Sequence, residues 1–371
     1  MRLRLQLVFI CVGFVCFSKI GPVVSQQVTK VTKTDFPQQL RLKGEAILDD
    51  DFNHHHMIYV NDTILLTTAN SGKYHYHVFH KTKLNYLGSI GVRGEGPGEW
   101  EIPSTTAGQF EKGRDGIKVW HFDYLRGNFE LINITKTINS KSPTPIVDRR
   151  LRIDARSFPF YQLFMGSNQR IYTNAWIYEQ NRGRIKYIDL KTNKIQKSDL
   201  FPKIADIEHL PTEVINSLYG APFDKHPNKD VFVQAMFMFN RIDFFDANLN
   251  LTNSIVDGDN WKDNFYNGRD IKVNENFLRP RINGYDGLSV GEKFVFVLEA
   301  KKNVGTDQFK ENQSFIRVFT LDGKPLSYIE ILHDLSSIDY DESSGVLYAT
   351  DYSHELVLRF DLARQSAEWK L

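Results

Sequence analysis

Cysteine is almost absent from this sequence of 371 residues, and both cysteines, Cys11 and Cys16, lie close to the N-terminus. A chain that begins after them can hold neither a disulfide framework nor a thiolate metal site. A surplus of one sign of charge is also lacking, because the formal net charge is only +1. A near-neutral protein lacks the electrostatic footprint of nucleic-acid binding. We therefore expect no thiol chemistry and no nucleic-acid partner.

Long hydrophobic runs are scarce too. The apolar-rich run from Leu5 to Phe17 has 13 residues, whereas a membrane-spanning helix needs about 20. Arg2 and Arg4 precede this run, and a small-residue stretch that resembles a cleavage site ends at Ser25. This order of features is typical of a secretory signal peptide, which we place at residues 1–25.

Export follows from this interpretation. We expect the mature chain to begin at Gln26, to have no membrane span after cleavage, and to reach the periplasm, the cell envelope or the exterior. A lipid anchor on Cys16 is the alternative. The bulky Phe14 and Val15 before Cys16 argue against it, because lipid-attachment signals favour small residues there.

Sustained helical periodicity is the last feature that the sequence lacks. Aromatic residues reach 13% of the chain, and together with many Val, Ile and Thr residues they fit half-buried strands. A short apolar strand that ends in a polar residue recurs six times along the chain. These polar residues are His80, Asn133, Asp189, Asp246, Thr320 and Asp361.

Each polar residue is followed by a turn and another apolar strand, which is the pattern of a propeller blade. We predict an all-β fold, a six-bladed β-propeller over residues 40–371 that is expected to be a monomer, preceded by a flexible leader at residues 26–39. A strand at Leu40 to Leu48 is expected to close the ring by pairing in the last blade with Glu355 to Leu362. A pair of β-sandwiches is the alternative fold, but six matched units argue against it.

A glycine-rich stretch follows the first unit, with the sequence GSIGVRGEGPGEW over residues 88–100. It resembles the GxGPGE-aromatic stretch of a TolB-like six-bladed propeller family of exported Gram-negative proteins. The resemblance covers about residues 40–371 and implies a propeller fold and an envelope location, but no established reaction. This chain departs from the family in two respects: its leader lacks a good lipid-attachment cysteine, and the interval between its fourth and fifth blades is long.

Two interpretations of the glycine-rich loop stay open. Arg93, Glu95 and Glu99 could hold it in place by hydrogen bonds, or its side chains could contact a ligand. A phosphate-binding loop is not supported, because no Lys-Ser/Thr pair follows the glycines.

Connections from the outer strand of one blade to the inner strand of the next emerge on one face of a propeller. Here they are predicted at residues 88–103, 139–159, 199–217 and 257–283, and the second holds Arg149, Arg150 and Arg152. Aromatic and arginine side chains are enriched at binding hot spots. The predicted ligand-binding residues are therefore Arg93, Glu99, Trp100, Trp261, Tyr266 and Arg281. The alternative is that the tryptophans plug the loops against the blades.

The sequence favours a binding or scaffold module that recognises a protein or a carbohydrate over an enzyme. It contains no nucleophile elbow and no metalloprotease motif, and its histidines do not recur at one position of the repeat. We predict no metal site, no cofactor and no particular catalytic residue. The alternative function is a metal-dependent hydrolase or lyase with its site in the central channel of the propeller.

Overall fold

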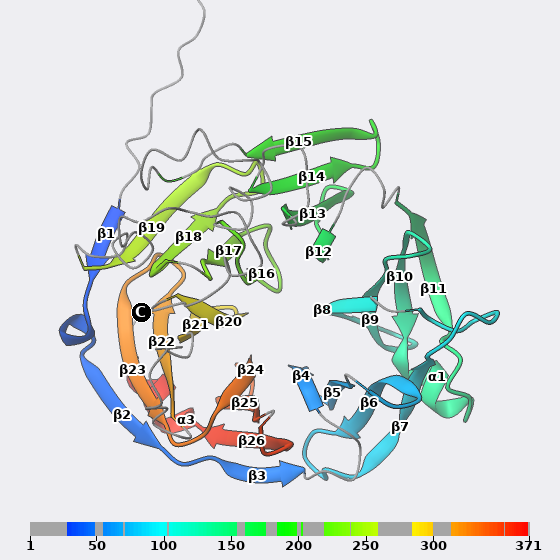
Figure 1. Cartoon of the computed structure of the whole chain (residues 1–371), viewed down its shortest axis with the longest axis horizontal. Coiled ribbons are helices and arrows are strands. Elements are labelled where there is room, and N and C mark those ends of the chain that lie inside the picture. The colour runs from blue at the N-terminus through cyan, green and yellow to red at the C-terminus, as the bar shows by residue number, and fades with distance from the viewer. Residues whose placement is uncertain are drawn as a thin grey trace, which may run out of the picture.

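The structure, a computed structural model, describes residues 28–48, 55–69, 71–101, 104–153, 160–175, 184–198, 202, 219–237, 239–258, 284–299, 313–351 and 353–369. The expected signal peptide at residues 1–25 lies outside them. Within the described residues the strands form six sheets, arranged as blades in a ring (Figure 1). The predicted six-bladed propeller is therefore confirmed.

Each blade is an antiparallel sheet whose first strand lies nearest the centre of the ring (Figure 1). Blades 1 to 3 consist of β4 (His55–Val60), β5 (Ile64–Ala69), β6 (Tyr74–His80) and β7 (Tyr86–Val92); β8 (Ser104–Gly113), β9 (Gly116–Asp123), β10 (Asn128–Asn133) and β11 (Val147–Arg152); and β12 (Phe160–Met165), β13 (Arg170–Ala175), β14 (Ile185–Asp189) and β15 (Lys194–Ser198). Blades 4 to 6 consist of β16 (Phe223–Lys225), β17 (Phe232–Ala235), β18 (Arg241–Phe245) and β19 (Leu251–Asp257); β20 (Tyr285–Val290), β21 (Phe294–Glu299), β22 (Ser314–Thr320) and β23 (Pro325–Ile331); and β24 (Leu335–Asp341), β25 (Val346–Asp351) and β26 (Leu356–Asp361).

The hydrophobic core lies between blades, which explains why the middle strands are apolar without alternation. In β21, Phe294, Phe296 and Leu298 pack against blade 6, whereas Val295 and Val297 pack against blade 4. Successive side chains of a strand point to opposite faces of its sheet. Both faces of a blade are covered by its neighbours, so both sets of side chains are buried.

The six polar residues of the repeat end the third strand of each blade or follow it directly. In every case the side chain accepts a hydrogen bond from a backbone N–H two to four residues further on. The pairs are His80 with Thr82, Asn133 with Lys136, Asp189 with Lys191, Asp246 with Asn248, Thr320 with Lys324 and Asp361 with Ala363. The repeat therefore records the turn chemistry that follows the third strand of each blade.

The N-terminal segment follows the outer edge of three successive blades (Figure 1). Strand β1 (Val28–Val31) pairs in parallel with β19, and β2 (Gln38–Leu42) pairs in parallel with β23. Between them lies a short 3-10 helix, η1 (Lys33–Asp35). Residues 28–39 of the expected leader thus include strand β1, helix η1 and the start of β2, and the two strands cover the edges of blades 4 and 5.

Strand β3 (Glu45–Leu48) pairs with β26, so the predicted closure of the last blade by an N-terminal strand is confirmed. The predicted extent of that strand was wrong, because residues 40–42 belong to β2 and pair with blade 5. The chain passes from one blade to the next at Gly44, where a Cβ atom would lie 2.7 Å from the Phe360 ring.

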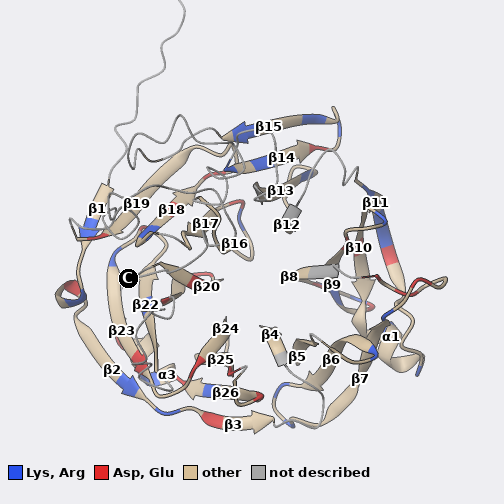
Figure 2. Ribbon diagram, in the orientation of Figure 1, with Lys and Arg blue, Asp and Glu red and all other residues tan. Residues whose placement is uncertain are grey.

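The ring has two different faces. The connections between successive blades lie on one face, which we call the loop face; the turns between the first and second strands of each blade lie on the other, the hairpin face. Both signs of charge are distributed around the ring (Figure 2). Helices α1 (Ile134–Asn139) and α3 (Ala363–Glu368) have six residues each. No helix in the described part of the chain is long and apolar enough to cross a membrane.

Candidate functional site

The glycine-rich stretch forms a closed loop on the loop face, which we call the motif loop (residues 93–101). Its two ends meet, because the Trp100 N–H donates to the Val92 carbonyl at 2.8 Å and the Gly94 N–H donates to the Trp100 carbonyl at 3.1 Å. Inside the loop, the Gly96 N–H donates to Glu99 Oε2 at 2.9 Å. The backbone of the loop is therefore fixed by its own hydrogen bonds.

Trp100 anchors this loop in the core between blades 1 and 2. Its side chain is 4% exposed and stacks on His121 with a ring-centroid distance of 3.9 Å. Gly91 lies beneath the indole with a φ of 77°, and a Cβ atom there would be 2.1 Å from the ring. Glycine is thus required on both conformational and steric grounds.

Two buried histidines complete the anchor. His75 Nε2 lies 3.1 Å from the Trp100 carbonyl oxygen, and His121 Nδ1 lies 2.6 Å from the Tyr76 hydroxyl. Burial lowers the pKa of His75 to about 4 and holds the pKa of His121 well below its usual value. Both rings are therefore neutral near pH 7 and pack as aromatic side chains.

Two arginines fasten the motif loop to its neighbours. Arg93 donates to the carbonyl oxygens of Ala69 and Tyr74 in blade 1. Arg126, from the turn between β9 and β10 of blade 2, donates to the Glu99 carbonyl and lies 3.4 Å from that of Gly96. The role of Arg126 could not be predicted from the sequence, because the loop carbonyls to which it donates belong to residues about 30 positions away.

The structure brings three of the predicted ligand-binding residues together, namely Arg93, Glu99 and Trp100. Their described contacts are internal ones, as in the two structural alternatives weighed from the sequence. Trp261, Tyr266 and Arg281 lie outside the described residues, so ligand binding by the six residues stays a prediction. Arg149, Arg150 and Arg152 were misplaced, because they lie on the outer strand β11 and not in a connection.

A separate cavity of about 610 Å³ occupies the centre of the ring. All six innermost strands contribute to its wall, and the lining reaches the hairpin-face turns of blades 1, 4, 5 and 6. Such a volume is in the range of small-molecule sites, roughly 300 to 1,000 Å³.

Hydrogen bonds connect each innermost strand to the next around this cavity. The six links run from Tyr59 to Thr106, Gln109 to Met165, Phe223 to Gln162, Val290 to Asp224, Ser289 to Asp339 and Val60 to Asp339. The carboxyl groups of Asp224 and Asp339 thus join blades 4, 5, 6 and 1. Both line the cavity and are half-buried, and this burial raises the pKa of Asp224 to about 8 and that of Asp339 to about 7.

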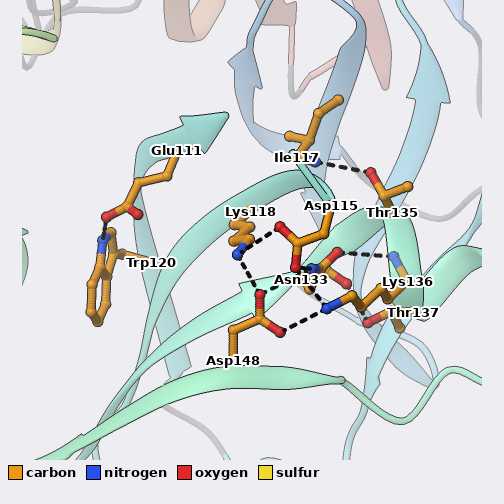
Figure 3. Close-up of polar contacts among 10 residues, drawn as sticks. All are labelled: Glu111, Asp115, Ile117, Lys118, Trp120, Asn133, Thr135, Lys136, Thr137 and Asp148. Atoms are coloured by element: carbon orange, nitrogen blue, oxygen red, sulfur yellow. Dashed lines mark hydrogen bonds and ion pairs between the residues drawn. The ribbon is translucent and has the colours of Figure 1, made fainter. Parts of the chain in front are cut away.

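A charged cluster on the hairpin face of blade 2 is the most extensive polar network in Figure 3. Lys118 Nζ lies 3.0 Å from Asp115 and 2.5 Å from Asp148. Lys136 Nζ lies 2.7 Å from Asp115 and 3.5 Å from Asp148. Two cations and two anions neutralise one another, so the arrangement braces α1 against β9 and β11.

Metal chemistry finds no support in the described parts of the chain. No group of three or more His, Cys, Asp or Glu side chains there could hold a metal ion. Near Trp100, His75 Nε2 and His121 Nδ1 are engaged in hydrogen bonds, and the His121 ring stacks on the indole. The metal-dependent hydrolase or lyase considered from the sequence is therefore unsupported.

Comparisons with known proteins agree with this fold. The chain resembles a DUF4221 family member from Bacteroides vulgatus, with 12% identity, a TM-score of 0.53 and coverage of 86% of this chain and 96% of that one. It also resembles a protein from Bacteroides fragilis, with 11% identity, a TM-score of 0.50 and coverage of 87% and 99%. No curated protein matches. Residues 35–343 match the family described as TolB-like 6-blade propeller-like, and the chain belongs to this family.

Proposed function

We propose that this protein is an exported binding or scaffold module that recognises a protein or a carbohydrate on its loop face. The observation that carries the proposal is the fixed geometry of the motif loop. Trp100 of the loop is buried in the core, Arg93 donates to blade 1, and Arg126 of blade 2 donates to the loop backbone. A surface whose backbone is already ordered loses less conformational entropy on binding. Loops placed on a rigid scaffold are also where binding residues are concentrated.

The recognition residues proposed on this face are Trp261, Tyr266 and Arg281, together with Arg93 and Glu99 of the motif loop. The connection that holds the first three begins after β19 and ends before β20. It therefore joins the fourth strand of one blade to the first strand of the next, as the motif loop does. Aromatic and arginine side chains are the types that dominate binding energies in interfaces.

A paired substitution tests this assignment. The purified mature protein is first screened against a glycan panel and against envelope proteins, and its best ligand is then titrated. Trp261→Ala combined with Arg281→Ala should weaken binding by at least about 2 kcal/mol if these are hot spots, with little change in melting temperature.

The matched control is Lys191→Ala combined with Lys194→Ala, two exposed lysines at the turn between β14 and β15. This turn lies on the hairpin face, so the control should leave affinity unchanged. Loss of binding in the control pair alone would place the ligand on the opposite face.

Export is tested separately by the mass and N-terminal sequence of the protein recovered from its native host. We expect a chain that begins at Gln26, because Val23-Val24-Ser25 provides the small-residue cleavage site. A lipidated or uncleaved product would contradict this part of the proposal.

A further inference from the structure

The central cavity differs chemically from the loop face. Its lining contains eight Asp or Glu residues and three Lys residues. Two of the lysines are already paired with carboxylates, Lys112 with Asp62 and Lys225 with Asp230. Asp341 is paired with Lys81, and the raised pKa values of Asp224 and Asp339 leave both groups at least partly protonated at neutral pH. The other carboxylates of the lining, Glu111, Asp286, Glu292 and Glu342, still outnumber the remaining lysine, Lys293. The wall therefore keeps a modest surplus of negative charge, which favours a positively charged ligand.

Glu342, in the hairpin-face turn of blade 6, is the best placed of these carboxylates. Its Oε2 accepts hydrogen bonds from the backbone N–H groups of Glu292 and Lys293, at 2.5 Å and 3.1 Å. These donors belong to the corresponding turn of blade 5, so the carboxylate is held in one position. Its Oε1 is buried and has no hydrogen-bond partner among the described residues. A buried carboxylate oxygen without a partner is costly, and a donor on a ligand would relieve that cost.

Apolar side chains complete the lining. Met57, Phe110 and Leu288 come from three different blades, line the cavity and remain partly exposed. An inorganic cation would leave this apolar surface in contact with water. A ligand that combines a hydrocarbon chain with an ammonium group would use both kinds of surface.

We propose that the central cavity binds an aliphatic amine, with the ammonium group donating to Glu342 Oε1 and the hydrocarbon chain lying along the apolar part of the wall. The site is distinct from the loop face and does not depend on the function proposed for that face. A lysine side chain of a partner protein offers the same chemistry as a free diamine, and the probes below are chosen to measure that chemistry alone.

Three six-carbon probes that differ only in their end groups test the proposal: hexamethylenediamine, hexamethylene glycol and adipate. The mature protein is titrated with each by calorimetry at low ionic strength and neutral pH. The diamine should bind at least about tenfold more tightly than the glycol, as one charge pair can provide. Adipate should not bind. Equal affinity for diamine and glycol, or tighter binding of adipate, would overturn the proposal.

Glu342→Gln then tests the position of the ammonium group. The amide oxygen can keep both backbone hydrogen bonds, whereas the oxygen without a partner becomes an NH₂ group that repels a donor. We expect diamine affinity to fall to that of the glycol. The matched control is Glu330→Gln on the outer strand β23, which removes the same charge next to Arg41 and should leave affinity unchanged.

Equal losses in the two variants would show that the diamine responds only to net charge, and would overturn the assignment to Glu342. If Glu342→Gln does not fold, the comparison of the three probes on the unaltered protein still decides whether the cavity selects an amine. Failure here leaves the loop-face proposal intact, because that proposal is tested by the Trp261 and Arg281 pair.

Discussion

The two faces of the propeller use their polar groups in opposite ways. On the loop face, Arg93, Glu99 and Arg126 are engaged in hydrogen bonds that hold the motif loop. On the hairpin face, Glu342 keeps one carboxylate oxygen without a partner among the described residues, next to the central cavity. The glycine-rich segment that stands out most in the sequence thus uses these side chains to hold its own backbone, whereas a carboxylate oxygen without a described partner lies in an ordinary turn.

The largest effect that separates the two faces is expected from Trp100→Ala. Removing the indole leaves a cavity between blades 1 and 2 and unstacks His121, so the free energy of unfolding should fall by about 3 to 5 kcal/mol. Urea unfolding followed by circular dichroism measures this. Glu95→Ala, an exposed position in the same loop, should change it by less than about 0.5 kcal/mol. A similar small loss for Trp100→Ala would show that the loop face is not anchored in the core.

The fold could be predicted from the sequence largely because its repeat is local. His80, Asn133 and the four equivalent residues accept hydrogen bonds from backbone groups only two to four positions away. Such a turn places the same short pattern, an apolar strand that ends in a polar residue, in the sequence of every blade. The two parallel strands of the N-terminal segment leave no such pattern, because no hairpin connects β2 to β23. For this reason residues 40–42 were assigned to the wrong blade.

The candidate sites were less predictable, because their contacts come from other blades. The motif loop could be located from its glycines, but the role of Trp100 depends on His121 of the next blade. Asp224 and Asp339 had no visible partner, since the donors that link them to other blades are the N–H groups of Val290 and Val60 and the Ser289 hydroxyl, which belong to neighbouring inner strands. The sequence does contain one signal for Asp339. It lies between the apolar residues Ile338 and Tyr340 in the strand Leu335–Asp341, where a carboxylate needs a hydrogen-bond partner.

Arg126→Ala should have the second largest effect. The guanidinium group holds carbonyl oxygens of the motif loop, and hydrogen bonds that involve a charged group contribute about 1.5 to 3 kcal/mol. These carbonyls can reach water when the arginine is removed, so the loss should lie near the lower end. Hydrogen exchange should increase at Gly94 and Trp100, the amides that close the loop. Unchanged exchange there would mean that the loop holds its shape without blade 2.

The pH dependence of stability should have opposite signs in the two regions. Burial lowers the pKa of His75 to about 4 from its usual 6.5. As the pH falls, the unfolded protein therefore binds a proton at His75 before the folded protein does. The contribution of His75 to stability is lost as pH falls from 6.5 towards 4. Burial raises the pKa of Asp224 to about 8 from its usual 3.8. The contribution of Asp224 is therefore present at acid pH and is lost as pH rises from 3.8 through 8.

Asp224→Asn and His75→Gln separate these two contributions. The first should reduce the loss of stability on the alkaline side, to which Asp339 also contributes, and leave the acid side. The second should reduce the loss on the acid side, to which His77 and His121 also contribute, and leave the alkaline side. Urea unfolding in buffers that span both windows measures the profiles. If both variants flatten the same side, the two regions do not titrate independently.

The smallest effect is expected in the charged cluster on the hairpin face of blade 2 (Figure 3). Lys136 lies against Asp115 and Asp148, and these contacts hold the pKa of Asp115 at about 2. The charges are exposed to water, however, and exposed ion pairs contribute little to folding and are screened by salt.

Lys136→Ala should therefore lower the melting temperature only slightly, and the difference should vanish at high ionic strength. Salt should also screen the ion pairs of Arg126 with Asp123 and Glu101. The larger part of the loss caused by Arg126→Ala should persist there, because that arginine also donates to backbone carbonyls that carry no net charge. If the Lys136→Ala loss survives high salt and matches that of Arg126→Ala, the hairpin face is held by polar contacts as firmly as the loop face, and the contrast between the two faces fails.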